Sequence, residues 1–301
     1  MKYVPPLCLT AVLCLIAIGT KAEAPARILN GEQLRVEILP AQGARVSSLT
    51  WRGQEILYRP ENTETSNNWG STFWISPQSL WGWPPVSRFD SDAYIELDRS
   101  AQSVRLRSQE AMSLVVEKTL TLDAEYGNQI LMNYDIHAQA TTPRIAAWEV
   151  SRFKRQGLAV FKARPGSIKT IMGTVDYTST PDGLVLVDFS QASHEGKLIG
   201  NSVNGWLAWF NAGLLYIKRY EPVPLDELAT GEGDVEIYIS STAPYMELEV
   251  QSAARSLDKG QTLGFTVRWL LCDVSNRAWS ANNSQLLLRT IEQCLSGELN
   301  E

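Results

Sequence analysis

Histidine and cysteine are scarce in this chain of 301 residues, which has two histidines and four cysteines. Cys8 and Cys14 lie in an apolar segment at the start, so only Cys272 and Cys294 remain beyond it. Neither of these has a cysteine or histidine neighbour at the spacing of a zinc site. A phosphate-binding loop and a serine-hydrolase nucleophile motif are also missing. We therefore expect no metal, no cofactor and no nucleotide or zinc chemistry.

Basic clusters are missing as well. The chain has 27 basic and 33 acidic residues, a net charge of −6, and no run of five or more basic residues. This composition argues against nucleic acid and anionic membrane surfaces as partners. After the first 24 residues no segment is apolar enough to span a bilayer, so we expect no membrane span in the mature chain.

The first 24 residues have the pattern of a secretory signal peptide. Lys2 precedes an apolar run over Leu7–Gly19, and Ala22-Glu23-Ala24 is a small-x-small cleavage site. The run is shorter than the roughly 20 apolar residues of a membrane anchor. We predict export, with a periplasmic or secreted mature chain over residues 25–301 that folds as one domain.

An oxidising compartment would allow Cys272 and Cys294 to pair. A bridge over a loop of this length would stabilise the fold by roughly 3 kcal/mol. The alternative is two unpaired thiols, one in a strand and one in a terminal helix. Export favours the disulfide.

Apolar and polar residues alternate with a period of two along most of the chain, with Gly, Asn, Asp and Pro between the runs. One convincing helix is expected, over Gln285–Leu295 with Ser284 as its cap. The pattern predicts an all-β fold, a large antiparallel β-sandwich with a short C-terminal helix. The clearest strand candidates are Gln33–Leu39, Ala44–Trp51, Met112–Asp123, Asn128–Ala138, Leu214–Tyr220, Tyr245–Val250 and Thr262–Leu271.

Four of the ten tryptophans lie between Asn68 and Pro85, in a stretch whose Gly, Pro and Ser content favours a loop. Flat aromatic rings stack on the apolar faces of sugar rings, and amide or guanidinium groups bind the hydroxyls. We expect two of the four tryptophans in the core and the others facing a groove. The candidate ligand-binding residues are Trp69, Trp74, Gln78, Trp81, Trp83, Arg88 and Trp148.

The stretch Phe73–Pro85 resembles the signature of a bacterial family of unassigned function within the galactose-mutarotase-like (aldose 1-epimerase-like) superfamily. Arg35–Leu57 is similar to the first hairpin of that superfamily. The resemblance continues to about residue 271, and it implies a supersandwich with a sugar-sized cleft on its concave face. It implies no particular reaction. Further similar pieces are Ala147–Glu149, Val235–Tyr238, Tyr245–Glu249, Leu257–Gln261 and Val267–Leu270.

Catalysis in mutarotases uses a glutamate and a histidine, but neither His137 nor His194 lies in a motif of the mutarotase type. Glu247 is a candidate base because it alternates with core residues on its strand. Glu149 is the other candidate, and since Trp148 precedes it, the two point to opposite faces and only one can line a cleft. Glu149 could instead lie at the surface or pair with an arginine such as Arg152.

Three functions remain open. The first is an exported protein that binds a carbohydrate or glycan in an aromatic cleft. The second is an enzyme acting on carbohydrate, an epimerase, mutarotase or lyase, with Glu247 or Glu149 as base. The third is an envelope protein-interaction module that uses the tryptophans as an interface. A cleft with a matched acid and base favours the enzyme, and a flat aromatic patch favours the interface.

Overall fold

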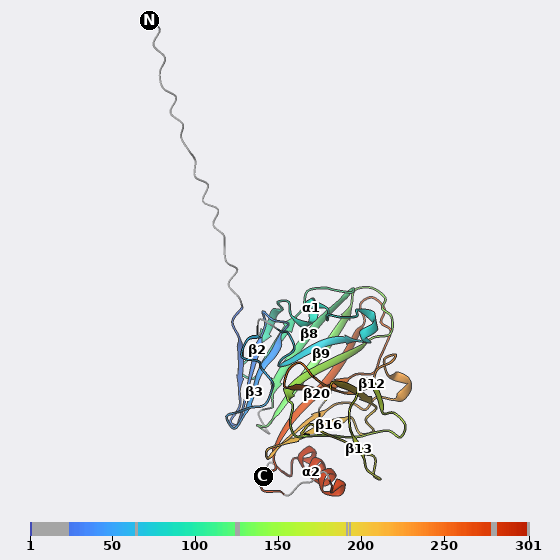
Figure 1. The fold of residues 1–301 in the computed structure, drawn as a ribbon. Coiled ribbons are helices and arrows are strands. Elements are labelled where there is room, and N and C mark those ends of the chain that lie inside the picture. Colours follow the sequence, from blue (N-terminus) through green and yellow to red (C-terminus); the bar gives the residue numbers. More distant parts are fainter. Residues whose placement is uncertain are drawn as a thin grey trace.

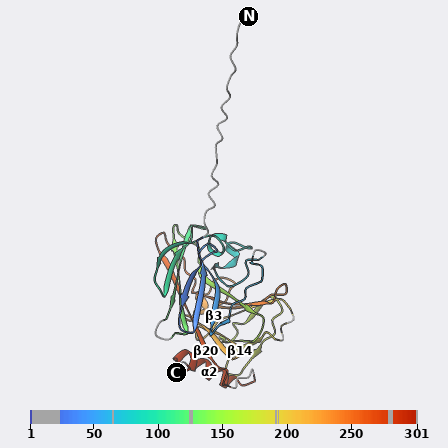
Figure 2. The same ribbon diagram turned by 90° about the vertical axis from the view of Figure 1, so that its left-hand side faces the viewer.

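Two antiparallel sheets stacked face to face make up the protein (Figures 1 and 2). The computed structural model describes residues 1, 24–63, 66–123, 127–190, 192, 194–277 and 282–299. The predicted signal peptide lies outside the described residues except for its two end positions. Among the described residues, no helix combines the length and the apolar character needed to cross a membrane. This architecture confirms the predicted all-β sandwich with a short C-terminal helix.

The first sheet, sheet A, has β10 and β19 near its centre and β12 at one edge. Every pairing within it is antiparallel. In spatial order its strands are β1 (Arg27–Asn30), β2 (Leu34–Leu39), β3 (Arg45–Trp51), β5 (Ser71–Ser76), β10 (Ala146–Lys154), β19 (Tyr245–Gln251), β18 (Val235–Ile239), β15 (Gly196–Gly200) and β12 (Lys169–Gly173), with β4 (Gln54–Glu55) paired to β3.

The second sheet, sheet B, is also antiparallel throughout and contains the longest strand, β20. In spatial order its strands are β13 (Thr178–Ser179), β14 (Leu184–Asp188), β11 (Leu158–Lys162), β16 (Trp206–Asn211), β17 (Leu214–Arg219), β20 (Thr262–Asp273), β9 (Gln129–Ala138), β8 (Leu114–Leu122), β7 (Ser103–Arg107) and β6 (Ile95–Arg99).

The core lies between the sheets and follows from the alternation in the sequence. Along β9, Ile130, Met132, Tyr134 and Ile136 are buried, whereas the residues between them are partly exposed. Side chains on successive strand residues point to opposite faces, so a period of two places one set in the core. Strands near the centre of sheet A differ, because β5 and almost all of β10 are buried on both faces.

The tryptophan-rich stretch is only partly the loop that its composition predicts. Its first half contains β5, an inner strand of sheet A, and a short 3₁₀ turn follows over Gln78–Leu80. A short helix, α1 (Ser87–Asp90), comes next. The strand forms because Ser71–Ser76 pairs with β10 along its length, and these tertiary contacts outweigh the local preference for a turn.

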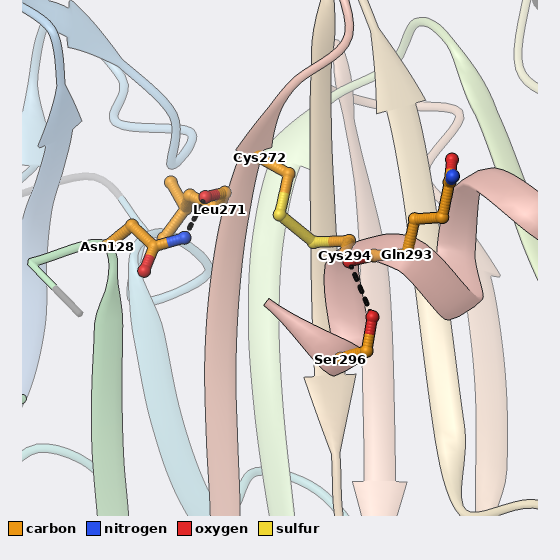
Figure 3. The surroundings of a disulfide bond; sticks show 6 residues. All are labelled: Asn128, Leu271, Cys272, Gln293, Cys294 and Ser296. Carbon is orange, nitrogen blue, oxygen red and sulfur yellow. Dashed lines mark hydrogen bonds between the residues drawn. A yellow bond between two sulfur atoms is a disulfide. The ribbon is translucent and has the colours of Figure 1, made fainter. Parts of the chain in front are cut away.

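The C-terminal helix α2 (Ser284–Ser296) covers one end of sheet B (Figure 1). Its cap is Asn283, whose side chain accepts a hydrogen bond from the Leu286 amide at 3.1 Å, so the predicted cap at Ser284 is one residue too late. A disulfide between Cys272 on β20 and Cys294 on α2 joins helix and sheet (Figure 3).

Candidate functional site

The outer face of sheet A carries a continuous row of polar side chains across four strands. Antiparallel register places Arg152 of β10 opposite Glu247 of β19, Glu247 opposite Tyr238 of β18, and Tyr238 opposite Lys197 of β15. Residues directly opposite each other in a sheet share a face. Met172 of β12 continues the row at the edge of the sheet.

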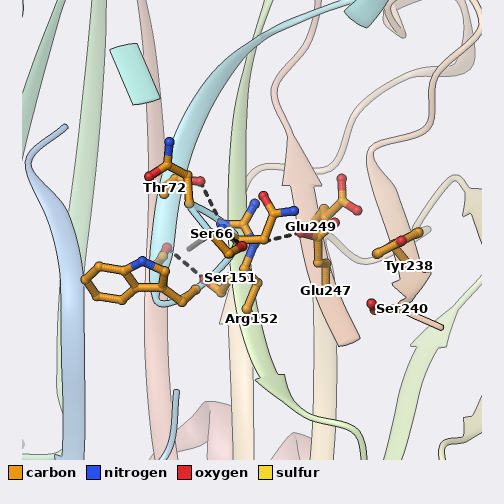
Figure 4. A network of polar contacts seen from close by, with 12 residues as sticks. Ser66, Thr72, Ser151, Arg152, Tyr238, Ser240, Glu247 and Glu249 are labelled. Atoms are coloured by element: carbon orange, nitrogen blue, oxygen red, sulfur yellow. Dashed lines mark hydrogen bonds and ion pairs between the residues drawn. The ribbon is translucent and has the colours of Figure 1, made fainter. Parts of the chain in front are cut away.

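Glu247, a predicted catalytic residue, is held by Arg152 in this row. Arg152 Nε donates to Glu247 Oε1 at 2.7 Å, and Arg152 Nη1 donates to Thr72 Oγ1 at 3.0 Å (Figure 4). Burial raises the pKa of the Glu247 carboxyl above its ordinary value, while the positive charge of Arg152 opposes that shift. The Nη2 atom of Arg152 is buried and has no hydrogen-bond partner among the described residues. This pair therefore places a carboxyl with raised pKa at the cleft described below.

Lys197 bridges two buried carboxylates beside that pair. Its Nζ lies 2.7 Å from Glu236 Oε2 and 3.1 Å from Glu249 Oε2, and both carboxylates are fully buried. Burial alone would lower the pKa of Lys197, but the two carboxylates outweigh it and raise that pKa above its usual value. Trp148 contacts the same group, since its Nε1 donates to Glu249 Oε2 at 2.8 Å and its ring centre is 4.6 Å from Lys197 Nζ. The two carboxylates therefore favour the charged ammonium form of Lys197 at the site.

The aromatic side chains beside this polar row pack on one another edge to face. Trp74 of β5 lies opposite Trp148 of β10, and their rings are nearly perpendicular, with centres 5.2 Å apart. Trp81 and Trp83 also meet the Trp74 ring, at 5.9 and 6.0 Å. Asp90 accepts a hydrogen bond from Trp74 Nε1 at 2.7 Å, which fixes the orientation of the indole.

A cleft of about 280 Å³ opens between the aromatic side chains and the polar row. This volume is near the lower end of the range of about 300–1,000 Å³ typical of small-molecule sites. Trp83 forms an exposed wall, with 60 % of its surface accessible. The residues lining the cleft are Asn68, Trp74, Gln78, Trp83, Met172, Glu195, Lys197, Tyr238, Tyr245 and Glu247.

Glu149, the other predicted catalytic residue, lies inside the sandwich. It is fully buried, and Lys218 Nζ of sheet B donates to its Oε1 at 3.0 Å. The hydroxyls of Ser71 and Ser151 donate to the same oxygen, at 2.9 and 2.6 Å. Strand alternation thus places Trp148 on the cleft face and Glu149 between the sheets, and Arg152 pairs with Glu247 instead. Glu149 does not line the cleft.

The other predicted ligand-binding residues are distributed unevenly. Trp74, Gln78 and Trp83 line the cleft, and Trp148 and Trp81 pack against its aromatic side. Trp69 lies outside it and is 1 % exposed, with the Arg45 guanidinium 4.5 Å from its ring centre. Arg88 also lies outside, on α1, where it pairs with Asp92 and Gln109.

Sequence reasoning missed several residues of the cleft. Lys197 lies in a short strand between two glycines, and nothing local distinguishes it from a solvent-exposed lysine. Tyr238 ends the Val235–Tyr238 segment, which carried part of the family resemblance. That resemblance could have marked Tyr238 as a candidate cleft residue. Glu195 accepts hydrogen bonds from Tyr238 and Ser241, and these lower the pKa of its carboxyl.

The cleft brings together apolar ring faces and hydrogen-bonding groups. It offers ring faces, amide groups, phenols, an ammonium and carboxylates within a single space. In the described part of the chain, no three His, Cys, Asp or Glu side chains are arranged to hold a metal ion. His137, which lies outside any mutarotase-type motif, is on the other sheet, sheet B, where its Nε2 is 3.6 Å from Glu117 Oε1.

Comparison with known proteins reveals similarity in sequence over one segment and in fold over most of the chain. Residues 168–272 match a domain of unknown function (DUF4380). This match includes β18, β19 and most of β20 but not the Phe73–Pro85 stretch. No curated protein matches the sequence.

Three solved structures illustrate the similarity in fold. A putative aldose 1-epimerase from Escherichia coli K12 has a TM-score of 0.57 at 12 % identity, with 83 % of this chain and 99 % of that chain covered. A galactose mutarotase related enzyme from Lactobacillus acidophilus has a TM-score of 0.54 at 8 % identity, with 85 % and 100 % covered. A galactose mutarotase-like protein from Clostridium acetobutylicum has a TM-score of 0.51 at 12 % identity, with 82 % and 94 % covered.

Proposed function

We propose that this chain, which has the galactose-mutarotase-like fold, is an exported protein that binds a carbohydrate in the cleft of sheet A. The observation that carries the proposal is the composition of the cleft. Trp74, Trp83 and Tyr238 supply ring faces, while Gln78 and Lys197 supply directional donors. Sugars combine apolar ring faces with hydroxyls, so a site for them needs both kinds of group.

The rigidity of the cleft supports binding. Trp74 is fixed by Asp90 and by three neighbouring indoles, so little side-chain freedom remains to be lost when a ligand stacks on it. The ion pairs below the cleft hold Glu247 and Lys197 in place in the same way. Export is supported by the signal-peptide pattern and by the disulfide between Cys272 and Cys294.

An enzyme acting on carbohydrate is the second candidate, and the environment of Glu247 favours it. Its carboxyl is buried beside the cleft with a raised pKa, which suits a group that takes a proton from a sugar hydroxyl. Lys197 is positioned to stabilise developing negative charge. An interface function has less support, since of the four clustered tryptophans only Trp83 is largely exposed.

Tryptophan fluorescence titrations with a panel of mono- and oligosaccharides test the proposal. Trp83→Ala should weaken binding about tenfold, equivalent to about 1.4 kcal/mol, because one stacking wall is lost. The matched control is Ile95→Ala, because Ile95 lies on β6 of sheet B and is as exposed as Trp83. This variant should bind the sugar with unchanged affinity. No response to any sugar, or unchanged affinity in Trp83→Ala, would contradict carbohydrate binding at this cleft.

An NMR anomerisation assay on common aldoses separates the two candidates. Acceleration that is lost in Glu247→Gln, while the sugar still binds, would support the enzyme. Binding without acceleration supports a binding protein for those sugars.

A further inference from the structure

Two hollows lie beside the Arg219 end of β17 in sheet B, and they share no lining residue with the cleft of sheet A. One has a volume of about 660 Å³ and reaches α2, where Glu292 and Leu295 line it. The other has a volume of about 830 Å³ and reaches Tyr220 and Phe265. Arg219, Pro222 and Arg268 line both hollows, so the two adjoin at these residues, and together they are here called the sheet B groove.

Two arginines face each other at the centre of this groove. Arg219 of β17 is directly opposite Arg268 of β20 in the antiparallel register. Like charges in that position repel and destabilise a sheet. A local arrangement that costs stability is expected mainly where it serves a function.

The two guanidinium groups are only partly neutralised by the protein. Arg268 Nη1 donates to Gln129 Oε1 at 2.8 Å and lies 3.4 Å from Asp123 Oδ2, and its side chain remains 41 % exposed. Arg219 Nη1 donates only to backbone carbonyls, those of Asn204 and Gly205. Among the described residues, no carboxylate forms an ion pair with Arg219. A neighbouring anion would therefore relieve the repulsion between the arginines.

Carboxylates also line the groove, but in the described part of the chain none of those lining it forms an ion pair with Arg219 or Arg268. Glu227 is bound by Arg255 at 2.6 Å, at one end of the groove. Glu292 belongs to α2 at the other end, and Glu221 forms no ion pair with either central arginine in the described structure. The positive charge is thus concentrated at the junction of the two hollows.

The rest of the lining suits a saccharide rather than a lone ion. Leu131, Phe265 and Pro222 provide apolar surface and Thr266 provides a hydroxyl, and the two volumes of about 660 and 830 Å³ are larger than one small anion can fill. A nucleic acid or polyphosphate chain fits poorly, because it needs a row of basic contacts and the centre of the groove offers only the pair Arg219 and Arg268. We propose that the sheet B groove binds an acidic oligosaccharide, with one carboxylate or sulfate group held between Arg219 and Arg268.

Isothermal titration calorimetry with the purified protein tests this site. The probes are oligogalacturonate, a sulfated galactan oligosaccharide, a neutral galactan oligosaccharide of equal length and a single-stranded oligonucleotide. We expect one or both acidic oligosaccharides to bind, and the tighter one identifies the anionic group. Binding should weaken at least tenfold in the Arg219→Gln/Arg268→Gln variant and remain unchanged in Arg99→Gln, an exposed arginine outside the groove.

Several results would overturn the proposal. They are the absence of binding by either acidic probe, equal affinity in the double variant, or tighter binding of the oligonucleotide. Loss of acidic-oligosaccharide binding in Trp83→Ala would place that ligand in the sheet A cleft instead. If Trp83→Ala loses only the neutral sugars, the proposed site at the sheet B groove still stands. If the double variant does not fold, Arg219→Gln decides alone, because Arg219 bonds only to backbone carbonyls. Retained binding in Arg219→Lys would then support the charge as the cause.

Discussion

The two outer faces of the sandwich carry charge in opposite ways. On sheet A, Arg152 is buried and Lys197 is 12 % exposed, and each is bound to a carboxylate of a neighbouring strand. On sheet B, Arg219 and Arg268 are opposite each other and remain open to solvent. The same register rule thus produces a neutralised, rigid site on one face and a partly neutralised, accessible one on the other. Charge in the first site is balanced within the protein, whereas part of the charge in the second is left for a ligand to balance.

The largest expected difference between the faces is in stability. Lys197→Met should lower the free energy of unfolding by about 3–5 kcal/mol, because it leaves the buried carboxylates of Glu236 and Glu249 without their cation. Arg219→Met, the matched change on sheet B, should change it by no more than about 0.5 kcal/mol. Urea unfolding of both variants measures the contrast, and equal losses would refute it.

The pH dependence of the Lys197 variant sharpens this comparison. Burial raises the pKa of Glu236 well above its ordinary value, so this carboxyl binds its proton more tightly in the folded than in the unfolded state. Its contribution to stability is therefore present at low pH and is lost as the pH rises. Without Lys197 the opposing attraction disappears, and the destabilisation should be smallest near pH 4 and grow towards neutrality. Destabilisation that does not change with pH would argue against unpaired carboxylates as its cause.

Strand alternation predicted the buried residues of strands that have one exposed face, but not the orientation of strands that are buried on both faces. Along β9 the period of two separates core from solvent, and the structure follows the prediction. Along β10 both faces are buried, so the sequence showed that Trp148 and Glu149 point in opposite directions but not which of them faces the cleft. Lys197 was missed for a related reason, since a lysine in a strand is expected at the surface unless its partners are known. Those partners lie on β18 and β19, three and four strands later in the chain.

Removing the disulfide should lower stability by an intermediate amount and should weaken binding only at the sheet B groove. The Cys272→Ala/Cys294→Ala variant should lose about 3 kcal/mol of stability, the value expected for a loop of 22 residues. Since α2 forms one wall of the sheet B groove, acidic-oligosaccharide binding should weaken as the helix loosens. Neutral sugar binding at the sheet A cleft should stay the same. Urea unfolding measures the stability of the variant and calorimetry its affinities, with the reduced wild type as control. If neutral-sugar binding weakened as much as acidic-oligosaccharide binding, the two sites would not be independent.

The smallest effect is the response of the two faces to salt. Between about 50 mM and about 500 mM salt the screening length falls from roughly 14 Å to roughly 4 Å, so binding by exposed charges weakens while stacking and buried hydrogen bonds change little. Acidic-oligosaccharide affinity at Arg219 and Arg268 should therefore fall several-fold, and neutral-sugar affinity at Trp83 should stay within about twofold. Calorimetric titrations at both salt concentrations provide the measurement. Lys197 forms ion pairs within the protein, whereas Arg219 forms none among the described residues. If the affinity for the neutral sugar falls with added salt, the charged side chains of the cleft contribute to its binding. A salt-insensitive acidic ligand would mean that the arginines do not hold it.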